Sequence, residues 1–234
     1  MQQNGHRGVA LDMDGVVIDG MQFHVAAWQH AFRQVANVEV PSLRIYLSEG
    51  AKEDHFIADM TKELELDLTP ALQAELLRCK LDYYDHVFHL APLAGIQQTL
   101  ELLRSQGYPL ALVTGAARTV AERVLTELGV RQWFDVVSGS DEVQQGKPAP
   151  EPYQKAAAAL GVSPQACLVV ENAPLGIQSA KAAGMTCVAL ETSLDASYMT
   201  GADRVVATHD GLQDLLRAEF ALSGGRGNWC LPSL

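Results

Sequence analysis

An apolar run near the N-terminus contains two acidic residues: VALDMDGVVID, residues 9–19. Asp12 and Asp14 lie two residues apart, where a buried strand is expected to end. Paired carboxylates repel each other, and charged side chains are seldom buried without a partner. The pair could simply form a turn or a helix N-cap, where Asp is favoured. The residues that the fold brings to the same strand end therefore decide between a structural and a chemical role.

Short apolar runs rich in Val, Leu and Ala recur along the chain, with helix-like segments between them. Near-continuous apolar runs are typical of parallel strands covered on both faces, and a glycine ends each of the helix-like segments from residue 95 onward. This alternation predicts an α/β fold with a doubly wound, mostly parallel sheet. The predicted strands are GVALDM (8–13), PLALVT (109–114), DVVS (135–138), ACLVVE (166–171), MTCVAL (185–190) and DRVVA (203–207).

Residues 21–91 interrupt the alternation with segments of helical period: MQFHVAAWQHAFRQVA, EDHFIADMTKEL and TPALQAELLRCKLDYYDHVF. They contain no convincing strand. We therefore expect an inserted α-helical cap domain over 21–91, and a discontinuous catalytic core made of 1–20 and 92–234. The Gly-rich end, SGGRGNWCLPSL, is expected to be a loose tail.

Composition narrows the class of protein. A hydrophobic content of 48% against 19% charged residues predicts a folded globular chain, and a net charge of −11 argues against nucleic acid or an anionic membrane as a partner. No signal peptide or membrane-spanning run is apparent, so we expect a cytoplasmic protein, a monomer or a weak homodimer. The scattered cysteines show neither a zinc nor a disulfide pattern and are expected to be free thiols: Cys79, Cys167, Cys187 and Cys230.

Ligands of doubly wound sheets bind beyond the carboxyl ends of the strands. Thr114 ends one predicted strand, Glu171 and Asn172 end another, and Lys147 follows a third within GKPAP. Together with the acidic pair, these residues bring carboxylates, a hydroxyl, an amide and an ammonium to one rim of the sheet. The candidate set is Asp12, Asp14, Thr114, Lys147, Glu171 and Asn172.

Such a set suits phosphoryl transfer, because a carboxylate can attack phosphorus and form an acyl-phosphate. The anionic nucleophile and the phosphate must approach each other, which calls for a divalent cation. Mg²⁺ prefers oxygen ligands, which Asp12, Glu171 and Asn172 can supply. Asp14 is placed to protonate the leaving oxygen and then to activate water.

The remaining polar groups of this rim are expected to bind the phosphate. Lys147 would neutralise charge on the transferring group. Thr114 and the backbone amides of Gly115 and Ala116 would donate hydrogen bonds to its oxygens.

Four motifs give the chain a resemblance to the haloacid dehalogenase superfamily: DMDGVVID, VTG, GKPAP and VVENAPLG, in the order of that family. The resemblance implies a Rossmann-like core, Mg²⁺ and an aspartyl-phosphate. By matching position it makes Asp12 the nucleophile, Asp14 the acid/base and a main-chain metal ligand, and Glu171 with Asn172 the metal end. Thr114 and Lys147 would hold phosphate. The second Asp is absent from dehalogenases, so the resemblance is to the phosphatases and phosphomutases.

The helical insert resembles the cap of the β-phosphoglucomutase-like branch, which implies that His24 lies near Asp14 and that Lys52 contacts a distal phosphate. Structural alternatives remain for both, a packed histidine and a solvated lysine. The match departs from the branch at Gly20, where threonine is expected, at Ser48, where lysine is usual, and at Asn172, where the usual residue is Asp. Asn172 could also be a simple cap.

Three hypotheses follow. The first is a Mg²⁺-dependent phosphatase that hydrolyses a small phosphorylated metabolite, such as a sugar phosphate, through an aspartyl-phosphate; the departures above favour it. The second is a β-phosphoglucomutase-like hexose phosphomutase, which would protect the aspartyl-phosphate from water. The third is a binding or regulatory protein that keeps the fold without turnover, for which Asn172 is the only hint in the sequence.

Overall fold

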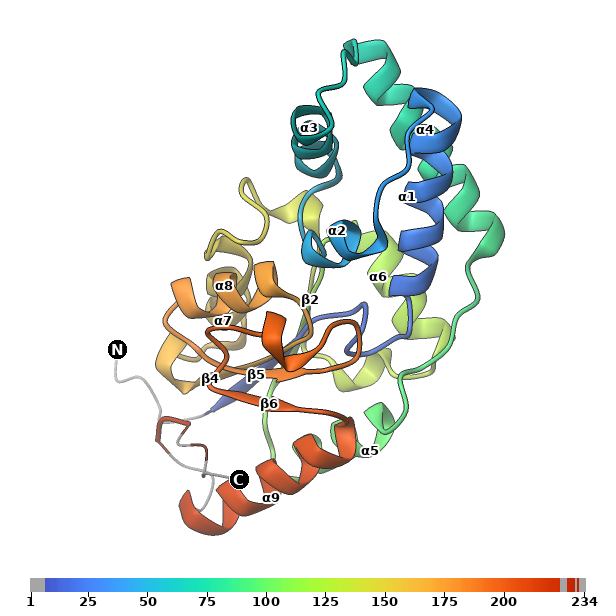
Figure 1. The fold of residues 1–234 in the computed structure, drawn as a ribbon. Coiled ribbons are helices and arrows are strands. Elements are labelled where there is room, and N and C mark those ends of the chain that lie inside the picture. The colour runs from blue at the N-terminus through green and yellow to red at the C-terminus, as the bar shows by residue number, and fades with distance from the viewer. Residues whose placement is uncertain (1–6, 224–226, 230, 232–234) are drawn as a thin grey trace.

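The computed structural model describes residues 7–223, 227–229 and 231. Within them, six parallel strands form one sheet in the order β3-β2-β1-β4-β5-β6 (Figure 1). This confirms the predicted doubly wound α/β fold. The strands are β1 (Gly8–Leu11), β2 (Leu110–Val113), β3 (Val136–Ser138), β4 (Cys167–Glu171), β5 (Thr186–Leu190) and β6 (Arg204–Val206).

Helices cover both faces of the sheet. Alternate residues of each strand point to opposite sides, so both faces present apolar side chains that a helix layer must bury. In β1, Val9 and Leu11 join one hydrophobic cluster while Ala10 joins the other. The first cluster packs under α5 (Ile96–Ser105), α6 (Arg118–Glu127) and α9 (His209–Ser223), and the second under α7 (Glu151–Leu160) and α8 (Pro174–Ala182). Short 3₁₀ helices lie at Arg131–Trp133, Ser140–Glu142, Pro164–Ala166 and Ala196–Tyr198.

The register sets the strand ends side by side. Leu11 of β1 pairs with Leu112 of β2 and with Val170 of β4. The residues that follow these positions therefore emerge at the same edge of the sheet. This edge is where the sequence predicts the functional residues.

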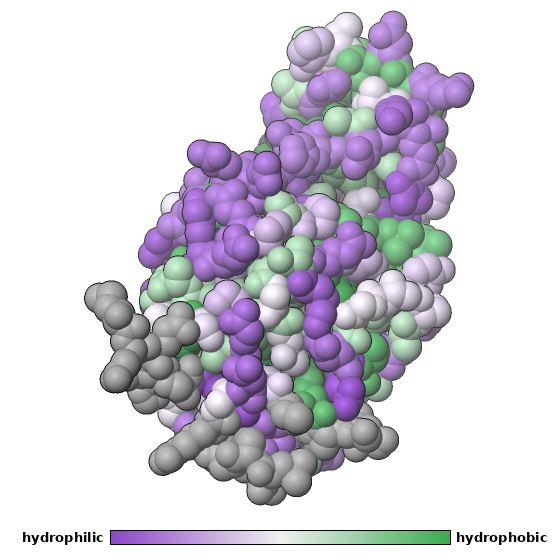
Figure 2. All heavy atoms as spheres, turned by 90° about the vertical axis from the view of Figure 1, so that its left-hand side faces the viewer, coloured by the Kyte–Doolittle hydropathy of each residue, from purple (hydrophilic) through white to green (hydrophobic). Residues whose placement is uncertain are grey.

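The inserted helical cap consists of α1 (Met21–Ala36), α2 (Ser42–Leu47), α3 (Glu53–Glu63) and α4 (Pro70–Val87). These helices enclose a hydrophobic cluster of their own, which includes Phe32, Phe56 and Leu76. Figure 1 shows them as a lobe beside the sheet, and Figure 2 shows that lobe as the narrower part of the molecule, with polar side chains prominent on the face in view. The boundaries at 1–20, 21–91 and 92–234 stay a prediction.

Two further expectations concern the chain ends and the cysteines. The prediction of a loose tail is wrong at Trp229, which is only 6% exposed. Its ring lies 5.2 Å from the ring of Tyr108, and its indole N–H donates to the Ala166 carbonyl at 3.1 Å. Residues 224–226, 230 and 232–234 of the tail lie outside the described residues. Cys79, Cys167 and Cys187 are free thiols, whereas Cys230 is not described.

The described part of the chain holds no helix that combines the length and the apolar character needed to cross a membrane.

Candidate active site

The structure brings the polar residues of the strand ends into one buried cluster below the cap. Asp12 follows β1, Glu171 ends β4, and Lys147 comes from the segment between β3 and α7. The Lys147 ammonium lies 2.5 Å from Asp12 Oδ1 and 2.6 Å from Glu171 Oε1. These three side chains are at most 7% exposed. Three segments far apart in sequence thus form a carboxylate–ammonium–carboxylate bridge.

Lys147 keeps its proton in this setting. Burial lowers its pKa, but Asp12 and Glu171 more than offset that effect, so the net pKa is raised above the ordinary lysine value. The ammonium also lies 5.2 Å from the centre of the Tyr153 ring, within the range of a cation–π contact. A permanent positive charge therefore sits beside the predicted nucleophile.

Asp12 has an elevated pKa. Burial is the main cause, Lys147 opposes it, and the nearby Glu171 and Asp14 add to it, so that the pKa of Asp12 is raised to about 7. The contact with Lys147 thus does not offset the burial of Asp12 and the two neighbouring carboxylates. A cation is the natural complement of this cluster.

Asp14 lies toward the cap. His24 Nε2, from α1, is 3.5 Å from Asp14 Oδ1, and the His24 ring packs against Tyr84 at 4.4 Å. Asp14 Oδ1 is buried and makes no hydrogen bond within the described residues. Gly20 makes room for it, since a Cβ added there would lie 1.9 Å from that oxygen. The Asp14 carboxylate is therefore held between β1 and the cap, and its Oδ1 atom is available to a ligand.

Both oxygens of Glu171 are engaged inside the protein. Oε1 accepts from Lys147 and from the Tyr153 hydroxyl at 2.7 Å, and Oε2 accepts from the backbone amides of Asn172 at 3.0 Å and Ala173 at 3.4 Å. A Cβ at Gly176 would lie 1.8 Å from Oε1, so the glycine is required for this close approach. Glu171 thus anchors Lys147. The sequence analysis did not single out Tyr153, which lies six residues after Lys147, shortly beyond the GKPAP motif.

Asn172 is fully buried and makes contact with the cap. Its Nδ2 donates to both carboxylate oxygens of Glu49, at 2.9 and 3.0 Å, and to Ser193 Oγ at 2.8 Å. Its Oδ1 has no hydrogen-bond partner among the described residues. Burial, followed by the charge of Asp12, raises the pKa of Glu49 well above its usual value. The sequence analysis did not single out Glu49 or Ser193, because nothing local to residue 172 indicates partners so far along the chain.

Thr114, Gly115 and Ala116 follow β2 at the same edge. The Thr114 amide donates to the Ser138 carbonyl at 3.0 Å, and Thr114 Oγ1 accepts from the Ala116 amide at 3.1 Å. A Cβ at Gly115 would lie 3.4 Å from the Gly50 carbonyl oxygen of the cap. The turn after β2 therefore lies directly under the cap.

Lys52 is engaged elsewhere than at the carboxylates. Its ammonium donates to the carbonyls of Val143 at 2.9 Å and Gln144 at 3.2 Å. It thus ties the cap to the core segment that leads to Lys147. Its contact with a substrate phosphate stays a prediction.

The donor set can be tested for its fit to a hard cation. Asn172 Oδ1 is a buried oxygen without a hydrogen-bond partner within the described chain, as expected of an atom that serves a ligand. In the same described residues, no three His, Cys, Asp or Glu side chains gather as a metal cluster. An oxygen-bound cation would therefore need the Asn172 amide and main-chain oxygen beside Asp12, a mixed set that suits Mg²⁺.

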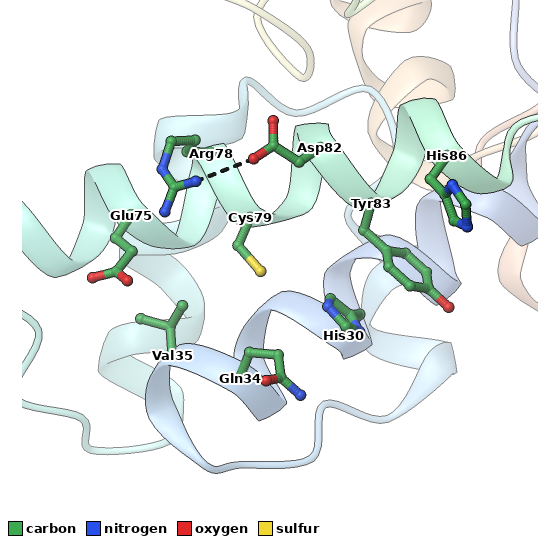
Figure 3. Close-up of a pocket in the computed structure, with 9 residues that line it drawn as sticks. All are labelled: His30, Gln34, Val35, Glu75, Arg78, Cys79, Asp82, Tyr83 and His86. Carbon is green, nitrogen blue, oxygen red and sulfur yellow. Dashed lines mark hydrogen bonds and ion pairs between the residues drawn. The ribbon is translucent and has the colours of Figure 1, made fainter.

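A cavity of about 440 Å³ lies between α1 and α4 in the cap, and Figure 3 shows its side chains. It shares no lining residue with the cluster around Asp12, so it is a feature of the cap surface and not the candidate site. The lining comprises His30, Gln34, Val35, Glu75, Arg78, Cys79, Asp82, Tyr83 and His86.

Comparison with known proteins identifies the family of the chain. The family model of the haloacid dehalogenase-like hydrolases matches residues 6–184. The chain is 36% identical to a validoxylamine A 7'-phosphate phosphatase of Streptomyces hygroscopicus subsp. limoneus, over 83% of this chain and 91% of that protein. It is 33% identical to the fructose-1-phosphate phosphatase YqaB of Escherichia coli (strain K12), over 78% and 95%.

The β-phosphoglucomutase of Bacillus subtilis (strain 168) is 30% identical to the chain, over 92% of this chain and 95% of that protein. The matched lengths take in the cap as well as the core. The chain therefore belongs to the haloacid dehalogenase-like hydrolase family, in its β-phosphoglucomutase-like branch.

Proposed function

We propose that the protein is a Mg²⁺-dependent phosphatase that hydrolyses a small phosphorylated metabolite, such as a sugar phosphate, through an aspartyl-phosphate. The observation that carries the proposal is the placement of Asp12 against Lys147 at the carboxyl end of β1. Asp14 lies two residues further along the chain, beside His24 of the cap. A nucleophile, a phosphate-binding cation and a proton carrier then share one enclosed site.

The reaction needs two displacements at phosphorus. The Asp12 carboxylate attacks the phosphoryl group, the ester P–O bond breaks, and Asp14 gives its proton to the leaving alkoxide oxygen. Asp14 then takes a proton from a water molecule, which attacks the aspartyl-phosphate and releases phosphate with Asp12 regenerated. Lys147 and Thr114 hold the phosphoryl oxygens in both steps.

The metal end is formed by Asp12, by the Oδ1 atom of Asn172 and by the main-chain oxygen of Asp14. Mg²⁺ bound there would offset the negative charges of the nucleophile and the phosphate. We assign Glu171 to the positioning of Lys147, since both its oxygens are used inside the protein. Its direct ligation of the metal stays a prediction.

The substrate class rests on the two phosphatase relatives, whose names place their phosphate on validoxylamine A and on fructose. The cap supports a small substrate, because Asp12, Asp14 and Lys147 are all under 9% exposed beneath it. Opening of the cap would admit the ester, and closure would exclude bulk water. The cytoplasmic location and the monomeric or weakly dimeric state stay predictions.

The test is phosphate release from a broad panel of sugar phosphates and other phosphate esters, with Mg²⁺ and with a chelator. We expect Mg²⁺-dependent release by the wild type and none by Asp12→Asn. Asp14→Asn should at most form a slowly hydrolysed phosphoenzyme. Full metal-dependent turnover by Asp12→Asn would reject the mechanism, and no release from any ester would favour a binding protein without turnover.

A hexose phosphomutase is the second candidate, favoured by the similarity to the Bacillus subtilis β-phosphoglucomutase. Gly20, Ser48 and Asn172 replace the residues usual in that branch and argue for the phosphatase. Conversion of β-glucose 1-phosphate to glucose 6-phosphate would favour the mutase. Release of free phosphate from many sugar phosphates would favour the phosphatase.

A further inference from the structure

One short segment of the cap, the closing loop (residues 48–52), makes several close contacts with the catalytic core. Gly50, with φ +84°, lies so close to Lys147 that an added Cβ would be 2.8 Å from its Cδ. Lys52 donates to core carbonyls at 2.9 and 3.2 Å. Glu49 extends from the loop into the core, where its carboxylate accepts from the Asn172 amide; the residue is only 9% exposed. The closed cap thus places an acidic side chain on the predicted metal end.

Burying the Glu49 carboxylate at this position is electrostatically unfavourable. Asp12 and Glu171 already share the Lys147 ammonium, and Glu49 adds a carboxylate to a buried space that also holds Asp14. A buried carboxylate persists only with hydrogen bonds or a cation. Asn172 supplies a bifurcated hydrogen bond to the two oxygens of Glu49, and an ionised Asp at 172 would supply none. The Asn in this motif is therefore the residue that lets Glu49 enter.

The same contact fixes the direction of the amide. Glu49 and Ser193 both approach Nδ2, which donates to the two Glu49 oxygens and to Ser193 Oγ. Rotation of the amide by half a turn would set Oδ1 against the Glu49 oxygens. Oδ1 is thereby aimed away from Glu49 and left as a buried acceptor, which is what a metal ligand requires.

We propose that Glu49 is a cap-borne positioning residue: by accepting from Asn172 it holds the cap closed and keeps Asn172 Oδ1 turned toward the metal end. The inference rests on the proposed function only where it gives Oδ1 a metal to bind. The Glu49–Asn172 pair also takes the place of the acidic residue usual at position 172, with the carboxylate supplied by the cap and only when the cap is closed.

The test exchanges the two side chains. In Asn172→Asp two carboxylates face each other, whereas in the double variant Glu49→Gln with Asn172→Asp the new amide can donate to the new carboxylate. Cap position is measured by the distance between spin labels at Asp59→Cys in α3 and Glu127→Cys in α6, with Cys79 and Cys230 replaced by serine, with and without Mg²⁺. Both label sites are exposed.

We expect Glu49→Ala and Asn172→Asp to lower the closed population at least about fivefold, and the double variant to recover most of it. Ser193→Ala should stay closed, because it removes only the core partner of Nδ2. Equal closed populations in wild type, Glu49→Ala and Asn172→Asp would overturn the proposal, as would a double variant no more closed than Asn172→Asp.

Mg²⁺ affinity, measured by calorimetry without substrate, is the second readout. Glu49→Ala and Ser193→Ala should each weaken it about 10- to 100-fold, the usual cost of losing an outer hydrogen-bond partner of a metal ligand. Glu75→Gln, an exposed acidic residue of α4, is the matched control and should change neither readout. Unchanged affinity in both variants would reject the role of Glu49 in orienting the amide. Absence of Mg²⁺ binding in the wild type would instead reject the proposed function, and the label distances would still decide on closure.

Discussion

Lys147 Nζ lies 2.5 Å from Asp12 Oδ1, and this ion pair joins residues 135 positions apart in the chain. The same ammonium binds Glu171 at 2.6 Å, so one buried lysine bridges two buried carboxylates. Breaking a buried pair by removing one partner leaves an unpaired charge, which is far more damaging than loss of an exposed pair. Lys147 therefore serves stability and chemistry at once.

We expect Lys147→Met to lower the free energy of unfolding by about 3–5 kcal/mol, since Asp12 and Glu171 lose their counter-charge. It should also lower kcat/KM on the best phosphate ester by about 10²–10³, the order found when a charge-stabilising donor is removed. Urea unfolding and steady-state kinetics measure the two effects.

The matched control is Lys181→Met. Lys181 pairs with Asp203 at 2.6 Å, but both side chains are 37% exposed. Its loss should cost less than about 1 kcal/mol and leave kcat/KM unchanged. Equal losses in the two variants would mean that burial of the Lys147 bridge has no energetic role.

The raised pKa of Asp12 makes stability depend on pH. The pKa is about 7 in the folded protein against 3.8 for the free side chain, so between these values the folded state binds the proton more tightly than the unfolded state. The contribution to stability is thus present below about pH 4 and is lost as the pH rises through about 7. In chelator, the free energy of unfolding of the wild type relative to Asp12→Asn should fall from about pH 5 to about pH 8.

Urea unfolding at a series of pH values measures this difference, and the comparison with Asp12→Asn cancels the titration of groups that do not interact with Asp12, such as His209. Saturating Mg²⁺ should remove most of the fall, because a cation stabilises the ionised carboxylate. A difference that is flat with pH in chelator would contradict the raised pKa.

The core of the site was predictable from sequence because each of its residues follows a strand. Asp12, Thr114 and Glu171 end apolar runs that could be recognised one by one, and parallel strands must end at a common edge. The register confirms this, with Leu11 level with Leu112 and Val170. Local pattern and sheet geometry together sufficed here.

The partners of these residues were not predictable in the same way. Glu49 meets Asn172 only because the closing loop descends onto the sheet, and a contact of 123 positions in sequence leaves no local pattern. Tyr153 lies in a segment of helical period, and no local pattern shows the partner of its hydroxyl, which is Glu171 at the end of β4. Trp229 lies in a Gly-rich stretch, where composition alone favours a loose tail.

Gly20 offers a test of the acid/base. Its backbone is in the right-handed helical region, at φ −95° and ψ −23°, so alanine fits the main chain. The added Cβ would lie 1.9 Å from Asp14 Oδ1 and must displace the carboxylate. We expect Gly20→Ala to lower kcat about 10- to 100-fold, because proton transfer by a positioned group contributes about 10²–10⁴. Mg²⁺ affinity should change less than about twofold, since Asp14 Oδ1 is not among the oxygens assigned to the metal.

Gly211→Ala is the control for Gly20→Ala. The new Cβ there meets Val206 Cβ at an ordinary 3.4 Å, in α9. Steady-state kinetics and calorimetry should show no change in this variant. If Gly20→Ala kept the wild-type kcat, Asp14 would not act from the position that the structure gives it.

The Tyr153 hydroxyl gives the last prediction. It donates at 2.7 Å to Glu171 Oε1, and burial followed by the charge of Glu171 raises its pKa well above the usual value, so the hydroxyl remains a donor throughout the working pH range. A hydrogen bond to a charged group contributes about 1.5–3 kcal/mol, so Tyr153→Phe should lower the free energy of unfolding by about that amount. Glu171 would then hold Lys147 less firmly, and kcat should fall about tenfold with KM little changed.

Tyr198→Phe is the control. Tyr198 is half-buried and packs on the hydrophobic cluster that contains Tyr153, and its hydroxyl makes no hydrogen bond to another described residue. Should both variants lose stability alike and keep kcat, Tyr153 would be a packing residue and Glu171 would position Lys147 unaided.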